Sequence, residues 1–339
     1  MSSSHSASPR PFISIIVPCY NEQSTIRLLL EAIHAQDYPS QSMEVVIADG
    51  MSNDGTRDEI ALFQKSCQDL IVKIVDNPER AIPAALNHAI AAARGEYILR
   101  LDAHSLPGSS YVARCVRALQ AGLGDNVGGI WNIQPRGESW QARAIATAAA
   151  HPLGVGDARY RVGGSAEAVD TVPFGAFHRS LFDRVGYFDE TLLTNEDYEF
   201  NARIRRSGGT VWLDPSIQST YFARGSFSEL ARQYWRYGFW KARMLRRYPG
   251  SFRWRQLAGL FVFSFLFLGI LGFWLPWAWG LLIFEASVYT LTLILAGALA
   301  AYRSRDFALF IGTPLAIAVM HFAWGAAFLW SIFTSMFNR

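Results

Sequence analysis

The sequence is poor in cysteine and in charged residues. Its three cysteines, Cys19, Cys67 and Cys115, are widely spaced and odd in number. They provide neither a disulfide framework nor a paired Cys-x-x-Cys metal site, which fits a reducing compartment. Charged residues make up only 17% of the chain, against about 25% in an average soluble protein. Because hydrophobic residues make up 51%, the composition excludes a disordered or collagen-like chain.

Two common phosphate-binding motifs are also absent. The sequence contains no Gly-x-x-x-x-Gly-Lys-[Ser/Thr], and no Gly-x-Gly-x-x-Gly follows its first apolar run. This disfavours phosphate recognition by those loops. The glycine-rich segment 154–164 follows a predicted helix and carries two arginines, and we expect it to be a mobile loop.

The scarcity of charge is concentrated at the C-terminal end. From residue 257 onward there are two acidic and three basic residues: Glu285, Asp306, Arg303, Arg305 and Arg339. A membrane-spanning helix needs roughly 20 apolar residues, and buried helices of soluble proteins seldom have such long uncharged runs. The pattern therefore predicts three transmembrane helices at about 257–275, 277–301 and 307–335, with a turn at Pro276.

The arginines predict how these helices are oriented. Arg303 and Arg305 place the second loop in the cytoplasm by the positive-inside rule, whereas the uncharged, tryptophan-rich turn at 274–279 suits the opposite interface. The N-terminal part would then be cytoplasmic and Arg339 outside. A carboxylate such as Glu285 in a span costs roughly 2.5–3.5 kcal/mol, so it either faces another helix or is protonated.

Residues 226–256 form a basic and aromatic segment. It contains Arg232, Arg236, Lys241, Arg243, Arg246, Arg247, Arg253 and Arg255, interleaved with tyrosine, tryptophan and phenylalanine. This composition, next to a predicted span, indicates an interfacial amphipathic helix that contacts anionic headgroups. Some of these side chains would serve as snorkelling anchors. A nucleic-acid patch has a similar composition, but the position beside the membrane argues against one.

Residues 12–225 alternate between strand and helix patterns, whereas residues 1–11 read as a flexible tail without the apolar core of a secretory signal. Strands are predicted at Ile13–Pro18, Glu44–Ala48, Ile71–Val75 and Glu96–Leu101, and helices around 26–33, from Thr56, and at Ile82–Ala93. Thr56 and Glu59 have capping-box spacing. Alternation of this kind predicts an α/β domain with a mostly parallel, Rossmann-like sheet and helices on both faces.

Ligands of such sheets bind beyond the carboxyl ends of the strands. Polar motifs follow the predicted strands: Tyr20-Asn-Glu22, Asp49-Gly50, Asp76-Asn77 and Asp102-Ala-His104. The sequence therefore predicts a ligand site along this edge.

Five motifs occur in one order along the chain. They are Val17-Pro-Cys-Tyr-Asn-Glu22, Asp49-Gly-Met-Ser-Asn-Asp-Gly-Thr56, Asp102-Ala-His104, Asn195-Glu-Asp197 and Gln233-Tyr-Trp-Arg-Tyr237. Together they resemble the family 2 glycosyltransferases with the GT-A fold, most of all the ExoA-type succinoglycan glucosyltransferases. The resemblance covers residues 11–249 and implies a membrane-attached enzyme of bacterial exopolysaccharide assembly.

The resemblance implies a pocket for the nucleotide-sugar donor. Its expected residues are Pro18, Tyr20, Glu22, Asp49, Asn77, Arg80 and Asp102, with Asp49 accepting a hydrogen bond from uracil. The alternative for Asp49 is a turn residue before Gly50. The Asp-Gly-Met-Ser sequence departs from the usual Asp-Gly-Ser of the family.

Asp102 and His104 stand where the family has its DxD metal motif. A divalent cation there would act as a Lewis acid and stabilise the diphosphate leaving group. Carboxylate oxygen suits Mg²⁺ or Mn²⁺, and imidazole shifts the preference away from Mg²⁺. The alternative for His104 is a structural histidine.

The remaining motifs imply the catalytic base and the acceptor side. Asp197 would take the proton of the acceptor hydroxyl, with Glu196 orienting it or binding the acceptor. Their alternative role is to be the acidic first turn of a helix. Gln233, Arg236 and Tyr237 resemble the QxxRW motif that closes over diphosphate and acceptor, and Gly175 would allow close approach of a ligand.

The resulting interpretation is an inverting hexosyltransferase that uses a UDP-sugar, expected to be UDP-glucose. Its acceptor would be a polyprenyl-diphosphate-linked saccharide, and its location the cytoplasmic face of the bacterial inner membrane. No nucleic-acid partner is expected. One alternative is a processive polysaccharide synthase, for which several copies would have to assemble around a channel. The other is a non-catalytic protein that binds a nucleotide or a polysaccharide.

Overall fold

The computed structural model describes residues 10–249, 253 and 257–337. Most of the predicted N-terminal tail, and residues 250–252 and 254–256 of the predicted interfacial segment, lie outside the described residues. The chain divides into two compact units, residues 1–131 with 163–220, and residues 132–162 with 221–339. This division differs from the contiguous one expected from the sequence, because residues 132–162 group with the C-terminal helices.

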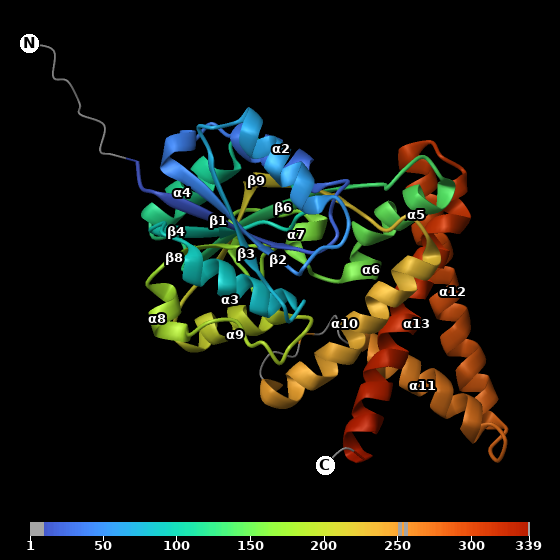
Figure 1. The fold of residues 1–339 in the computed structure, drawn as a ribbon. Coiled ribbons are helices and arrows are strands. Elements are labelled where there is room, and N and C mark those ends of the chain that lie inside the picture. Colours follow the sequence, from blue (N-terminus) through green and yellow to red (C-terminus); the bar gives the residue numbers. More distant parts are fainter. Residues whose placement is uncertain (1–9, 250–252, 254–256, 338–339) are drawn as a thin grey trace, which may run out of the picture. The chain divides into compact units, whose positions relative to one another are not determined.

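The first unit is built on a sheet with helices around it (Figure 1). The strands are β1 (Ile13–Cys19), β2 (Met43–Asp49), β3 (Ile71–Asp76), β4 (Tyr97–Arg100), β5 (Leu106–Pro107), β6 (Asn126–Gln134), β7 (Glu167–Ala168), β8 (Ala176–His178) and β9 (Val211–Phe222). The helices are α1 (Ile26–His34), the 3₁₀ turn η1 (Ser40–Ser42), α2 (Thr56–Ser66), α3 (Ile82–Ala92), α4 (Tyr111–Gln120), α8 (Leu181–Val185) and α9 (Glu196–Arg206). Strands β6 and β9 continue into the second unit.

The sheet is mixed, with the order β3-β2-β1-β4-β8-β6-β9-β5, and β7 pairs with β9. Strands β3, β2, β1 and β4 are parallel, as predicted. The prediction of a mostly parallel sheet is wrong for the other half, where β8 pairs antiparallel with β4 and β6, and β5 and β7 pair antiparallel with β9. Three of these strands have only two or three residues, too few to show an apolar period.

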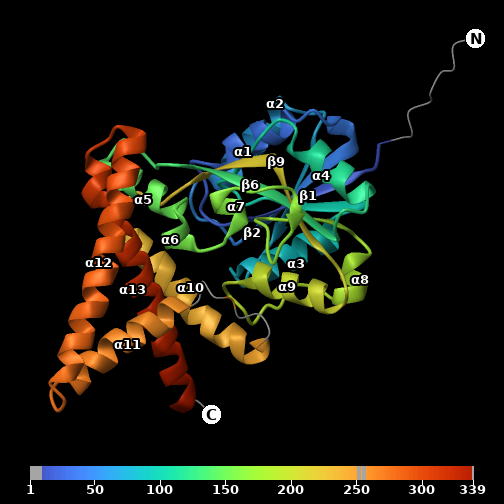
Figure 2. The same cartoon turned by 180° about the vertical axis from the view of Figure 1, so that it is seen from behind.

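Helices cover both faces of the sheet (Figures 1 and 2). On one face Ile13, Ile15 and Val17 of β1 are buried in one core with side chains of α1, α2 and α4. On the other face α3 packs against β1, β2 and β3. This sandwich explains why the parallel strands are nearly continuous apolar runs, and it leaves their carboxyl ends as the edge for polar groups.

Helix α2 begins at Thr56, but the predicted capping box is wrong. The N-cap residue is Gly55, which contributes no side-chain cap. The carboxylate of Asp54 instead accepts a hydrogen bond from the backbone N–H of Thr56 at 3.0 Å. Asp54 thus satisfies a free N–H of the first turn, a role that the Thr56-to-Glu59 spacing does not indicate.

The second unit is helical. Its helices are α5 (Trp140–Ala149), α6 (Pro152–Val155), α7 (Arg159–Val162), α10 (Phe227–Arg247), α11 (Ala258–Leu271), α12 (Trp277–Ser304) and α13 (Ala308–Phe337). Helix α13 packs against α5, α10, α11 and α12. The expected loop at 154–164 is wrong in part, since it contains the end of α6 and all of α7, two single-turn helices.

Two of the described helices, α12 and α13, are long and apolar enough to cross a membrane. Helix α12 begins directly after Pro276, where the sequence predicts a turn. Helix α11 is apolar but shorter, with 14 residues, about 21 Å at the helical rise.

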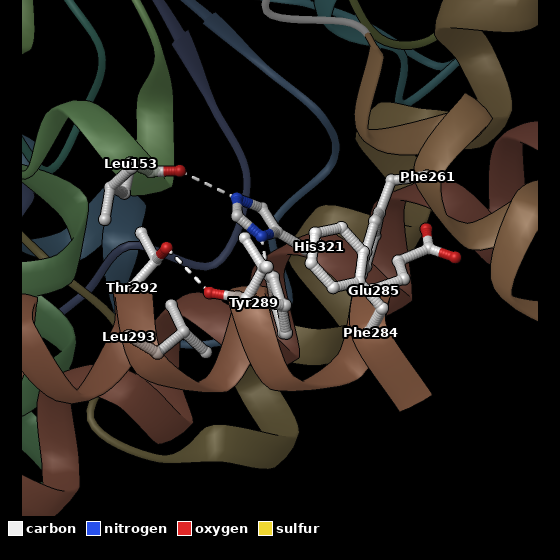
Figure 3. Close-up of a pocket in the computed structure, with 9 residues that line it drawn as sticks. Leu153, Phe261, Phe284, Glu285, Tyr289, Thr292, Leu293 and His321 are labelled. Carbon is white, nitrogen blue, oxygen red and sulfur yellow. Dashed lines mark hydrogen bonds between the residues drawn. The ribbon is translucent and has the colours of Figure 1, made fainter. Parts of the chain in front are cut away.

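Polar side chains of these helices are paired within the second unit (Figure 3). The Ser264 hydroxyl donates to the Glu285 carboxylate at 2.5 Å. The His321 ring contacts the Tyr289 hydroxyl at 3.0 Å and the Leu153 carbonyl at 2.7 Å. Glu285, Tyr289, Leu153 and His321 border a largely apolar cavity of about 430 Å³. Glu285 therefore faces another helix, one of the two arrangements expected for it.

Helix α10 is anchored at its start and along its length. The Ser226 hydroxyl accepts a hydrogen bond from the N–H of Glu229, and the Glu229 carboxylate accepts one from the N–H of Gly225 at 3.1 Å. This is close to a capping box, but the carboxylate bonds to the residue before the N-cap. Further along, a Cβ at Gly238 would lie 2.1 Å from the carbonyl oxygen of Trp324. Only glycine allows α10 and α13 to approach this closely.

Candidate functional site

Asp49 ends β2 with its carboxylate fully buried. It accepts hydrogen bonds from the Ser52 N–H at 3.1 Å, the Ser52 hydroxyl at 2.5 Å and the Arg57 guanidinium at 2.6 Å. Arg57 also bridges to Asp76, which ends β3, at 2.6 Å. The carboxyl ends of two neighbouring strands are thus tied together by one cation, and most of the acceptor capacity of Asp49 is used within the protein.

The other residues predicted for the nucleoside pocket lie beside this network. The Arg80 guanidinium lies 5.4 Å from the centre of the exposed Tyr20 ring, a cation–π distance. The Asn77 N–H donates to the Asp49 carbonyl at 2.8 Å, and its own side-chain oxygen is buried without a hydrogen-bond partner. Pro18 pairs with Ala48 of β2. The structure therefore gathers these residues along the predicted edge.

Glu22 and His104 bring the first and fourth strand ends together. Their carboxylate oxygen and ring Nδ1 lie 3.0 Å apart, and the Thr25 hydroxyl donates to the other carboxylate oxygen. Burial alone would raise the pKa of Glu22, but the hydrogen bonds from His104 and Thr25 outweigh it, and the pKa lies below its usual value. Glu22 is therefore an anion beside the predicted metal motif.

Arg100 joins the predicted metal residue to the predicted base. This side chain is buried, with 7% of its surface exposed. Its Nε donates to Asp102 at 3.1 Å and its Nη1 lies 3.1 Å from the Glu196 carboxylate. Burial opposes its charge, but Asp102, Glu196 and Asp197 outweigh burial and raise the pKa of Arg100 further. One buried cation therefore contacts two carboxylates, and Asp197 follows the second of them in the chain.

Glu196 and Asp197 occupy the first turn of α9, as predicted. Glu196 is buried, and burial together with the negative charge of Asp197 raises its pKa to about 7, although Arg100 opposes the shift. Asp197 is half-buried, and its Oδ1 accepts the N–H of Tyr198 at 2.8 Å. The two neighbours thus differ: one carboxyl binds a proton readily near neutral pH, and the other is partly open to solvent.

Backbone strain is concentrated in the same loops. Of the six described non-glycine residues with positive φ, three follow the ends of β1, β2 and β3 (Asn21, Met51 and Arg80), one precedes β8 (Phe174) and one precedes α9 (Asn195). Such conformations cost roughly 1–3 kcal/mol each and cluster at functional sites. Their agreement with the motifs supports one site along this edge.

Asp102 and His104, the predicted metal ligands, are open to solvent and lack a third ligand from the described part of the chain. Among the described residues no group of three His, Cys, Asp or Glu side chains is placed to hold an ion. The Asp102 carboxylate is 28% exposed and His104 is more open. Mg²⁺ is commonly held by one or two carboxylates with substrate phosphates completing the shell. The residues fit an ion that binds together with a diphosphate.

Gly175 is required for reasons internal to the protein. Its φ is +104°, and a Cβ there would lie 2.6 Å from the Phe177 ring and 2.7 Å from the Asn126 side chain. The carbonyl of Gly175 accepts a hydrogen bond from the backbone N–H of Arg100 at 2.9 Å. The glycine thus supports the strand that carries Arg100.

The acceptor-side residues Gln233, Arg236 and Tyr237 lie on α10 in the second unit. The Gln233 amide donates to the hydroxyls of Tyr237 at 2.9 Å and Tyr221 at 3.1 Å. The guanidinium of Arg161 lies 5.7 Å from the Tyr221 ring centre. Burial and the neighbouring Tyr221 raise the pKa of Tyr237 despite Arg161. Gln233 and Tyr237 are therefore joined in one polar cluster.

Sequence reasoning missed three arginines. Arg57 and Arg100 bridge carboxylates, and Arg161 packs against tyrosines. Arg100 left a signal, because an arginine within the apolar strand Tyr97–Arg100 must find buried partners. Arg57 and Arg161 left none, because neither lies within an apolar run and their partners Asp76 and Tyr221 belong to other segments.

Comparison with known proteins identifies the family and the fold of the chain. A family model described as glycosyl transferase family 2 matches residues 14–186. The succinoglycan biosynthesis protein ExoA of Rhizobium meliloti is 31% identical over 93% of both chains. A dolichyl N-acetyl-α-D-glucosaminyl phosphate 3-β-D-2,3-diacetamido-2,3-dideoxy-β-D-glucuronosyltransferase of Methanococcus voltae is 29% identical over 91% of this chain and 94% of its own.

Solved structures share the fold. The mannosyltransferase PcManGT of Pyrobaculum calidifontis, in complex with GDP-Man and Mn²⁺, superposes with a TM-score of 0.63 at 23% identity, covering 96% of this chain and 88% of its own. TarS 1–349 of S. aureus, in complex with UDP, gives a TM-score of 0.51 at 17% identity, covering 93% and 90%. The strand-end site thus belongs to a GT-A fold. The chain is a hexosyltransferase of glycan biosynthesis and belongs to glycosyl transferase family 2.

Proposed function

We propose that this chain is an inverting enzyme that transfers a hexose, glucose from UDP-glucose, onto a polyprenyl-diphosphate-linked saccharide in exopolysaccharide biosynthesis. The observation that carries the proposal is that Arg100 contacts both Asp102 and Glu196 at 3.1 Å, and that Asp197 directly follows Glu196 in the chain. It brings a candidate leaving-group site and a candidate base to one place. The name of the Methanococcus relative, which includes a dolichyl phosphate, supports a lipid-linked acceptor.

In this mechanism Asp197 takes the proton from the acceptor hydroxyl while that oxygen attacks the anomeric carbon. Tyr20, Asn77 and Arg80 hold the nucleoside side of the donor, and Asp102 with His104 would hold Mn²⁺ or Mg²⁺. When bound, such an ion supplies Lewis-acid stabilisation of the departing diphosphate. Gln233, Arg236 and Tyr237 bind the acceptor side, where the planar guanidinium of Arg236 suits phosphate.

The proposal includes a bacterial inner-membrane location with the catalytic unit cytoplasmic. Helices α12 and α13 support membrane association, and α11 serves as a third span. Helix α10 lies at the headgroups, where Arg243 packs over the rings of Phe239 and Trp240 at 4.4 and 5.0 Å. Basic and aromatic side chains together favour an anionic interface.

The test supplies the full-length protein with UDP- and GDP-sugars and membrane-extracted polyprenyl-diphosphate acceptors, and identifies products by mass. We expect one hexose to be added, with UDP-glucose preferred. A ladder of products would instead identify a processive synthase, and no product with any donor would favour a non-catalytic binding protein.

The base is tested by Asp197→Asn, which keeps shape but cannot take the proton. Turnover should fall at least about 10²-fold, with UDP binding close to wild type. The matched control is Asp58→Asn, an exposed acid in the first turn of α2, which should leave turnover unchanged. Equal activity of the two variants would show that the acids of α9 only complement the helix dipole.

A further inference from the structure

We propose that Arg100 is a positioning residue that makes the donor side and the base side of the site depend on each other. This rests on the proposed function and adds to it a residue outside the five sequence motifs. Arg100 ends β4, and its two contacts lie in different parts of the chain. Asp102 follows it by two residues, whereas Glu196 begins α9.

The geometry requires a guanidinium. Nε and Nη1 contact Asp102 and Glu196 at the same distance, 3.1 Å. These atoms belong to one rigid plane, so fixing one carboxylate also fixes the other relative to it. An ammonium group carries the same charge but is a single point on a flexible stem. Lysine could therefore neutralise the cluster without holding both carboxylates.

The environment makes this contact strong. The side chains of Arg100 and Glu196 are each only 7% exposed, so solvent screens their attraction little. Arg100 is held in turn by its backbone, whose N–H donates to the Gly175 carbonyl at 2.9 Å. The backbone that carries the guanidinium group of Arg100 is therefore fixed to the sheet before any ligand binds.

The consequence concerns Asp197, which follows Glu196. The N-cap residue of α9 is Asn195, which has a left-handed φ of 68° and whose side chain does not cap the helix. The contact from Arg100 to Glu196 joins this end of the helix to β4. Holding Glu196 therefore fixes where Asp197 points. Conversely, ligands that orient Asp102 act through Arg100 on the same helix end, and such coupling is reciprocal.

The experiment compares Arg100→Lys and Arg100→Met with wild type in the full-length protein. Calorimetry measures binding of UDP with and without Mn²⁺, and steady-state kinetics give kcat and KM for donor and acceptor. Arg179→Lys is the matched control, because the guanidinium group of Arg179 also donates two hydrogen bonds, to the carbonyls of Gly95 and Ala93. It should lower the unfolding temperature without changing kcat.

For Arg100→Lys we expect UDP affinity with Mn²⁺ within about threefold of wild type and kcat reduced at least about tenfold. For Arg100→Met the gain in UDP affinity on adding Mn²⁺ should be lost while metal-free UDP affinity persists. If Arg100 acts through Glu196, then Arg100→Lys should reduce kcat much less when Glu196→Gln is already present.

Two results would overturn the inference. One is a kcat loss in Arg100→Lys that is undiminished in the Glu196→Gln background. The other is an unchanged Mn²⁺ effect on UDP affinity in Arg100→Met. A wild-type protein that binds UDP with Mn²⁺ but transfers no sugar would instead contradict the proposed function, so the two failures are distinguishable.

Discussion

Replacing Glu196 by glutamine is expected to stabilise the protein above neutral pH and to change its stability little at pH 5. The pKa of this buried carboxyl is raised from 4.5 to about 7. A raised pKa means that the folded chain binds the proton more tightly than the unfolded chain does. Wild-type stability therefore falls as the pH rises from about 4.5 to about 7, and levels off above that. Glutamine resembles the protonated carboxyl and escapes this loss.

The magnitude follows from the two pKa values. The difference corresponds to on the order of 3 kcal/mol at pH 8, as an upper value. In a domain of 150–250 residues each kcal/mol moves the unfolding temperature by about 2–4 °C. We therefore expect the Glu196→Gln variant to unfold up to roughly 6–12 °C above wild type at pH 8.

The assay is thermal unfolding of both proteins in the same detergent at pH 5, 6.5 and 8. Glu31→Gln is the control, since Glu31 is exposed and pairs only with Arg27 and solvent in the described contacts. That change should cost less than about 1 kcal/mol at each pH. A Glu196→Gln effect that is equal at pH 5 and pH 8, or destabilising at pH 8, would refute the reasoning.

Three further outcomes are expected. Gly129→Ala should unfold well below wild type, because its Cβ would lie 1.8 Å from the Ile217 carbonyl oxygen, whereas Gly280→Ala in open helical space should be neutral or stabilising by about 1 kcal/mol. Glu44→Gln should lose roughly 1.5–3 kcal/mol at pH 7, because its buried carboxylate accepts hydrogen bonds from its partners. Burial alone would raise the pKa of Glu44, but hydrogen bonds from its partners lower it, so the deficit should shrink as pH falls below about 4.5; a constant deficit contradicts this. His104→Asp should shift the ratio of Mg²⁺- to Mn²⁺-supported activity towards Mg²⁺, and an unchanged ratio would argue against ligation.

The parallel half of the fold could be predicted from the sequence because its signals are local. Strand β1 is an apolar run interrupted only by Ser14, and α1 shows Ile26, Leu29, Leu30 and Ile33 on one buried face. The antiparallel half gave no such signal. Strand β8 has three residues, and its place beside β4 is decided by tertiary pairing.

The candidate site shows the same division. Resemblance selected Asp102 after β4 and Glu196 and Asp197 at the start of α9, and in the structure Arg100 contacts both Asp102 and Glu196. The sequence indicates that Arg100 needs a buried partner, but it does not identify Glu196, which lies almost a hundred residues further along the chain. Which residue becomes such a buried partner depends on the three-dimensional path of the chain and not on the spacing of residues in the sequence.

The interleaved path of the chain changes how this protein can be dissected. Helix α5 lies well before α13 in the sequence, yet Ile145 and Ala148 share an apolar core with Ala316, Ile317 and Met320. Deleting everything after residue 225 would therefore remove the residues that pack on α5 and expose its apolar face to solvent. A soluble catalytic fragment made in this way would carry an aggregation-prone surface. A chimaera that exchanges the C-terminal helices would also have to exchange residues 132–162, so these two stretches form a single module for engineering.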